Sequence, residues 1–192
     1  MNNRDYLLYL INNVQQWNYW RSKHPEVFID LSGVTLSGYD LEGINLSGCK
    51  LHGVTLIGSN LRFANLSHAD LTGSNLIGVN LRLGNLRNAI FYKTILQRSN
   101  LSEANLVKTI ICESDFSRAV LYETELIEAT IYKTDFSHAQ LINTHLGKAS
   151  ILMSNFENAT IDGIDLRWAT IVHSPGFPPA PSPYCKQIFL SL

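Results

Sequence analysis

The chain has 192 residues, which suits a single domain with a buried core. Its formal net charge is −1, and Asp, Glu, Lys and Arg make up only 16 % of it. This charge balance does not predict binding to nucleic acid or to an anionic membrane, because both favour basic proteins.

The three cysteines, Cys49, Cys112 and Cys185, lie far apart and form no CxxC pair. We therefore expect free thiols rather than disulfides or zinc ligands. The first residues lack the basic, apolar and small-residue order of a signal peptide, and no apolar run approaches the roughly 18 residues of a membrane helix. These features predict a cytoplasmic protein.

Residues 3–23 are predicted to form one helix. Its apolar stripe follows the i, i+3, i+4 spacing of a helix face and consists of Leu7, Leu10, Ile11, Val14 and Trp17. Asn2 or Asn3 can cap its start, and His24-Pro25 ends it. We expect residues 1–27 to cap the element that follows.

From Leu31 to Ile171, every fifth residue is Leu, Ile or Phe, and no insertion shifts this frame of 29 positions. A period of five fits neither a helix nor a plain strand. Two residues before each of these central positions, the middle of the frame carries a small residue such as Ala64, Ala69 or Ser74. We expect both positions to point inward, as in a short strand, and the next residues to turn a corner.

A second period, of twenty residues, lies within the frame. It is marked by Ile111, Ile131, Ile151 and Ile171, and by Phe116, Phe136 and Phe156. Four pentapeptides therefore make one turn of a coil, and like residues stack in columns on successive turns. The 29 units over residues 28–173 predict an all-β rod of about seven turns.

Units such as Ala64-Asn65-Leu66 and Ala104-Asn105-Leu106 resemble the A(D/N)LXX unit of the pentapeptide-repeat family. The resemblance covers residues 29–172 and implies a right-handed quadrilateral β-helix. The run WNYWR, followed by a proline and then by DLSG, resembles the leader of cyanobacterial members with an N-terminal capping helix. Members of one fold share a shape more than a task, so the resemblance implies little about activity.

All six prolines lie outside the frame, as expected for a residue that cannot donate to a strand ladder. The proline-rich tail, residues 174–192, ends with the apolar run Ile188-Phe189-Leu190 before its last two residues. We expect the tail to be an extended cap on the last turn or a disordered segment. A ligand for an SH3-like partner is a third interpretation.

The stretch NLSHADL brings Ser67, His68 and Asp70 within four residues. A catalytic triad needs these groups in contact inside a pocket, whereas the frame points all three outward from a convex wall. We therefore predict no catalytic residue and no enzyme. The remaining histidines have no partner at ligand spacing, so we predict no metal site and no cofactor.

The outward columns carry charges in two patterns. Signs alternate in two columns, Lys93, Glu113 and Lys133, and Lys108, Glu128 and Lys148, which predicts structural ladders. A third column stacks Arg98, Arg118 and His138. Two interpretations remain open for it: the side chains splay toward Glu103 and Glu123, or they mark the footprint of an acidic partner.

One outward column is apolar and is our candidate interaction face. Its members are Tyr92, Cys112, Tyr132, Leu152 and Val172, with Ile90 and Ile110 beside it. An exposed apolar row of this length favours a contact with another protein or a second copy of the chain, unless the tail folds back over it. A smaller, secondary candidate is formed by Arg62, Phe63, Arg82 and Leu83.

These features predict a non-enzymatic scaffold for protein–protein interaction, with another protein or itself as partner. The alternative implied by the resemblance is a DNA-mimicking topoisomerase (gyrase)-binding protein. Such relatives resemble rods with acidic faces, and those that protect the enzyme carry loops that break the frame. This chain has neither a strongly acidic face nor such a loop.

Overall fold

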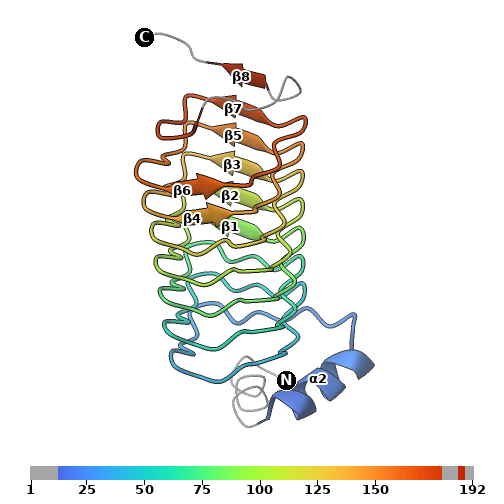
Figure 1. Ribbon diagram of the computed structural model, residues 1–192. Coiled ribbons are helices and arrows are strands. Elements are labelled where there is room, and N and C mark those ends of the chain that lie inside the picture. The colour runs from blue at the N-terminus through green and yellow to red at the C-terminus, as the bar shows by residue number, and fades with distance from the viewer. Residues whose placement is uncertain (1–12, 179–185, 189–192) are drawn as a thin grey trace.

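The computed structural model describes residues 13–178 with their side chains and the backbone of residues 186–188 (Figure 1). The chain winds into a rod of stacked four-sided coils. Helix α2 (Val14–Lys23) lies at the N-terminal end of the rod, and strand β8 (Lys186–Ile188) lies at the other end.

The coils are joined by parallel backbone pairs between residues twenty apart. On one side these pairs form a six-stranded sheet: β1 (Ile90–Tyr92), β2 (Ile110–Cys112), β3 (Thr130–Tyr132), β5 (Ser150–Leu152), β7 (Thr170–Val172) and β8. The strands β4 (Gln140–Ile142) and β6 (Thr160–Asp162) form a second sheet. Elsewhere the sides are single bridges with the same interval, so seven successive steps lead from Asp30 to Thr170. The expectation of four pentapeptides per turn is confirmed.

The predicted core is confirmed. All central positions of the frame are buried except Ile161, which is only partly covered because β6 is the last strand of its sheet. The small residues two positions earlier are buried beside them, and their hydroxyl groups are paired. The Thr94 hydroxyl donates to the carbonyl of Leu71, one coil below, at 2.9 Å, so these buried polar atoms carry no desolvation penalty.

The phenylalanine column stacks as the twenty-residue period predicts. The ring centroids of Phe116 and Phe136 lie 5.1 Å apart, and those of Phe136 and Phe156 lie 4.9 Å apart with planes only 3° from parallel. Phe177, after the last coil, packs edge-on against Phe156 at 4.9 Å. The ring therefore closes the upper end of this column.

Each corner of the coil depends on one residue with a left-handed backbone. The second residue after every central position has a positive φ, and most of these residues are not glycine. Glycine adopts this conformation freely, whereas a Cβ makes it unfavourable. Gly58, at φ +65°, has open space around its missing Cβ, so backbone conformation alone explains a glycine there.

The N-terminal helix is shorter than predicted. Asn13 is extended, with φ −165°, and its side-chain oxygen accepts hydrogen bonds from the N–H groups of Gln15 and Gln16 at 2.8 and 3.1 Å. The expectation of one helix over residues 3–23 is therefore wrong at Asn13, which caps α2 instead. The predicted end at His24 is confirmed. The expected caps Asn2 and Asn3 and the stripe residues Leu7, Leu10 and Ile11 lie outside the described residues.

Helix α2 covers the open end of the first coil with side chains that replace a missing coil. Trp17 is fully buried, and its indole N–H donates to the carbonyl of Asn45 at 2.7 Å. Asn18 accepts from the N–H of Asn45 and donates to the carbonyl of Gly43, both at 2.8 Å. Backbone groups that the stack leaves without a partner are thereby satisfied.

Arg21 extends this cap one helical turn further on. Its guanidinium donates to the carbonyl of Ser47 at 2.7 Å and to that of Val27 at 3.1 Å. Together with Trp17 and Asn18, it presents one face of α2 to the coil edge. The predicted capping role of this helix is confirmed, although hydrogen bonds contribute to it as well as apolar burial.

The C-terminal end is covered by β8, which pairs in parallel with β7 in the register Thr170 to Lys186 and Val172 to Ile188. Residues 186–188 therefore form the expected extended cap on the last turn. Strand β8 adds to the edge of the sheet and does not lie over its outer side. Cys185, Phe189 and Leu190 lie outside the described residues.

The first prediction concerns the N-terminal cap. Trp17→Ala should lower the free energy of unfolding by about 3–5 kcal/mol, because it leaves a cavity and an unpaired carbonyl at the first coil. Tyr19, on the same helix and 67 % exposed, is the control, and Tyr19→Ala should change stability by less than about 0.5 kcal/mol. Urea denaturation followed by circular dichroism measures both. Equal midpoints for the two variants would contradict the capping role.

The second prediction concerns the corners. Gly58→Val should lower the free energy of unfolding by about 1–2 kcal/mol, because a β-branched residue is strained at positive φ. Asn tolerates this conformation, so Gly58→Asn should lie closer to the wild type. Thermal denaturation of the wild type and the two variants measures the order of their stabilities. A Val variant as stable as the Asn variant would show that the corner conformation does not limit stability.

Candidate interaction surface

The structure brings the five predicted face residues together in one row. Each follows a buried central residue of the six-stranded sheet, and the strand register aligns them on successive coils: Tyr92, Cys112, Tyr132, Leu152 and Val172. Since alternate residues of a strand point to opposite sides of the sheet, all five side chains lie on the outside of the rod. We refer to this row as the apolar column.

The apolar column is widest near β1 and β2. Tyr92 is 37 % exposed, and Ile110, on the adjacent column, is 45 % exposed. Ile90 continues this second column toward the N-terminus, whereas Thr130 begins a polar stretch in the other direction. The accessible apolar surface is therefore two residues wide at its lower end and one residue wide above.

Lysine side chains border the apolar column on one side. The ammonium group of Lys93 lies 5.0 Å from the ring centroid of Tyr92, and that of Lys133 lies 5.2 Å from the ring of Tyr132. A hydrogen bond to Tyr92, the charge of that group and the nearby carboxylate of Glu113 raise the pKa of Lys93. The column thus has an apolar centre and a charged rim, as protein interfaces commonly have.

Cys112 lies in the apolar column with a partly exposed side chain. Partial burial, and secondarily the charge of Glu113, raise the pKa of its thiol, which keeps it protonated and weakly reactive. Cys49 is buried in the core, and burial raises its pKa to about 11. Both are free thiols, as the sequence predicted.

The secondary candidate lies two pentapeptides from the apolar column, on the opposite side of the rod. The Arg62 guanidinium lies 5.1 Å from the Phe63 ring centroid, and Phe63 is 49 % exposed. Arg82 donates two hydrogen bonds to Glu103, at 2.6 and 3.0 Å. Leu83 follows Phe63 on the next coil, so the four residues do form a cluster, but Arg82 is already paired within the chain.

The residues of the NLSHADL stretch do not contact one another as a triad. His68 lies 3.3 Å from the side-chain nitrogen of Asn88, on the next coil. Asp70 accepts from the hydroxyl of Thr72 at 2.6 Å and pairs with His52 at 2.7 Å. The stretch reflects the phase of the repeat, as the sequence indicated.

Several acidic side chains on the rod have a cationic partner on a neighbouring coil. Glu128 lies between Lys108 and Lys148, at 3.4 and 3.8 Å, which confirms this predicted ladder. Glu113 pairs with Lys93 at 3.7 Å. His145 pairs with Glu125 at 2.8 Å. The last pair was missed from sequence, although its twenty-residue separation was a usable signal.

The column of Arg98, Arg118 and His138 takes no part in this pairing. The proposed splaying toward Glu103 and Glu123 is wrong, because Glu103 is bound by Arg82 and Glu123 lies beside the Tyr122 hydroxyl, whose pKa it raises. Within residues 13–178, no ion pair or side-chain hydrogen bond involves these three cationic side chains.

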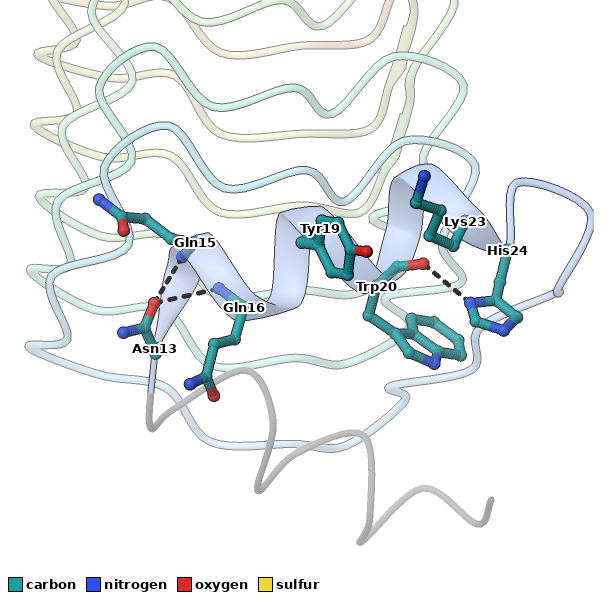
Figure 2. A pocket seen from close by; sticks show the side chains of 7 residues that line it. All are labelled: Asn13, Gln15, Gln16, Tyr19, Trp20, Lys23 and His24. Carbon is teal, nitrogen blue, oxygen red and sulfur yellow. Dashed lines mark hydrogen bonds between the residues drawn. The ribbon is translucent and has the colours of Figure 1, made fainter.

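A pocket of about 620 Å³ lies on the exposed side of α2 (Figure 2). It is lined by Asn13, Gln15, Gln16, Tyr19, Trp20, Lys23 and His24. Asn13 caps the helix, and a ring nitrogen of His24 lies 2.9 Å from the carbonyl of Trp20. All of its lining comes from one helix and its caps, so no converging set of reactive groups is present.

Within the described residues, no group of three His, Cys, Asp or Glu side chains is arranged to hold a metal ion. No helix among them has both the length and the apolar character that a bilayer crossing requires.

Parallel pairs at intervals of twenty, a buried residue at every fifth position and outward columns of side chains define a β-solenoid of pentapeptides. The model of the family described as pentapeptide repeats matches residues 29–62, 64–102 and 99–137, in eight copies. These segments make up more than half of the chain, which therefore belongs to the pentapeptide-repeat family. No curated protein matches the sequence significantly.

Solved structures share the fold. HetL, a pentapeptide repeat protein involved in heterocyst differentiation regulation in the cyanobacterium Nostoc, is 24 % identical over 84 % of this chain and 79 % of its own, with a TM-score of 0.38. A trypsin-treated form of QnrB1, a plasmid-mediated fluoroquinolone resistance protein, is 14 % identical over 85 % and 92 %, with a TM-score of 0.53. At such identities the likeness shows the fold alone.

Proposed function

We propose that this protein is a non-enzymatic, cytoplasmic scaffold that binds another protein, or a second copy of itself, through the apolar column. One observation carries the proposal: the column is apolar over five successive coils, whereas no other outward column of residues 31–173 is apolar over more than two. Contiguous exposed apolar surface is uncommon on proteins that have no partner.

The backbone under the apolar column is well suited to binding. It is hydrogen-bonded on both sides in a parallel sheet, so little conformational entropy is lost when a partner docks. Tyr92 and Tyr132 are large side chains with few rotatable bonds, which makes tyrosine a frequent anchor of interfaces. Lys133, at the rim, forms no ion pair within the described residues and favours a partner with an acidic group beside an apolar centre.

The third prediction tests this surface. Tyr132→Asp places a charge in the middle of the apolar column and should weaken the complex by at least about tenfold. Tyr122→Asp is the matched control, since Tyr122 has the same phase in the repeat and lies on the opposite side, 41 % exposed. Sedimentation velocity of the purified proteins measures self-association, and pull-down from extract of the native cell measures other partners.

Loss of the complex in Tyr132→Asp but not in Tyr122→Asp is the expected result. Sedimentation assigns that complex to a dimer if the purified wild type already associates. If complexes are the same for the wild type and both variants, the apolar column is not the contact surface.

The alternative, a DNA-mimicking topoisomerase (gyrase)-binding protein, requires a continuous acidic face. Glu103, Glu113 and Glu128 are each paired with a lysine or arginine, which argues against such a face.

The fourth prediction is therefore that a large molar excess of the protein leaves DNA supercoiling by gyrase unchanged. Heat-denatured protein serves as the control for non-specific effects. Inhibition by the folded protein alone would favour the DNA-mimic function over the scaffold.

A further inference from the structure

Side chains of one charge sign stack at one corner of the rod. Arg98, Arg118 and His138 are twenty residues apart, at φ values of 57°, 61° and 59°. Equivalent positions on neighbouring coils lie about 4.8 Å apart, which keeps the two guanidinium groups within reach of one small ligand. Like charges placed opposite each other on adjacent strands destabilise a sheet, so this column costs free energy unless a counter-charge is present.

Within residues 13–178, no carboxylate lies within 4.0 Å of Arg98 or Arg118. Two acids on this side of the rod, Asp115 and Asp135, are already hydrogen-bonded to other groups. Asp115 accepts from the N–H of Ser117 at 2.9 Å and from the side chain of Gln97 at 2.5 Å.

Asp135 is held in the same way. It accepts from the N–H of Ser137 at 2.9 Å and from the side chain of Asn155 at 3.1 Å. Around the corner, the next outward column is uncharged and consists of Asn100, Val120 and Gln140.

A groove of about 300 Å³ lies along the cationic column. It is lined by Gln97, Arg98, Ser117, Arg118, Ser137 and His138. The serine hydroxyls make no side-chain hydrogen bond within the described residues, so they remain able to donate. The groove therefore combines two guanidinium groups, an imidazole and two hydroxyls. The carboxylates of Asp115 and Asp135 are already engaged, whereas Glu157 follows Ser137 one coil further on, beyond the two arginines.

We propose that this groove binds a tetrahedral oxyanion, phosphate or a phosphate monoester, between Arg98 and Arg118. The planar fork of N–H groups on arginine matches phosphate oxygens and forms strong, charge-assisted hydrogen bonds. The hydroxyls of Ser117 and Ser137 supply donors for the remaining oxygens, and the imidazole of His138 lies at the same groove as a further donor. A dianion would offset the repulsion between the guanidinium groups of Arg98 and Arg118.

The fifth prediction uses inorganic phosphate and O-phosphoserine as probes, titrated into the full chain at constant ionic strength with sodium chloride. Isothermal titration calorimetry and the side-chain ¹⁵N resonances of arginine measure binding. The wild type should bind both probes saturably, and Arg118→Gln should bind at least about tenfold more weakly. Arg87→Gln removes an exposed arginine that also lacks an ion pair, on another side of the rod, and should bind as the wild type does.

Thermal denaturation provides a readout that a purely structural arginine would not give. Without phosphate, Arg118→Gln should unfold at the same or a higher temperature than the wild type, because a like-charge contact is removed. With phosphate, only the wild type and Arg87→Gln should gain stability.

Three results would overturn the proposal: no saturable binding to the wild type, equal weakening by Arg87→Gln and Arg118→Gln, or the same stabilisation by sodium chloride alone. Tighter binding of O-phosphoserine than of inorganic phosphate would support the site and assign its ligand to a phosphorylated side chain. The reverse order would support the site with free phosphate as its ligand.

Discussion

Parallel hydrogen bonding between residues twenty apart is the interaction on which the rest of this structure depends. Each coil closes after four pentapeptides, and backbone groups on each of its sides pair with the coil above or below. This pairing fixes which residues stack, so the sequence period becomes a set of straight columns. It also leaves two unpaired ends, which explains why α2 and β8 are needed. The outward columns then become the only variable surface that the fold offers.

The residue at each left-handed corner determines whether that corner presents a side chain on the outer surface. In the N-terminal part of the frame the corner residue is glycine in most units, from Gly33 to Gly78, and adds no side chain. From Lys93 to His138 every corner residue is non-glycine, at a cost of about 1–2 kcal/mol for each left-handed residue. The cationic groove lies within that region, and the apolar column begins there.

The sequence was sufficient for the frame, the buried positions, the stacked phenylalanines and the row of the apolar column, because each follows from an unbroken period. The period says nothing about exposed rotamers. For that reason the pairing of Arg82 with Glu103, which leaves Arg98 without a partner, was not foreseen. The break at Asn13 was missed because its neighbours continue the apolar stripe across it. The glycines at the corners were a visible signal for left-handed backbone that the sequence analysis did not use.

The most direct test of the scaffold function is the rate at which Cys112 is alkylated, measured by mass spectrometry of the cysteine-containing peptides. Cys112 lies within the apolar column and is partly exposed, whereas Cys49 is buried and serves as the internal reference for unfolding. The rate is compared between dilute purified protein and the complex isolated from the native cell, or the dimer if the purified protein associates. The account predicts that Cys112 reacts much more slowly in the complex while Cys49 stays unreactive in both. An unchanged Cys112 rate in an intact complex would contradict the account, because the partner would then occupy another side of the rod.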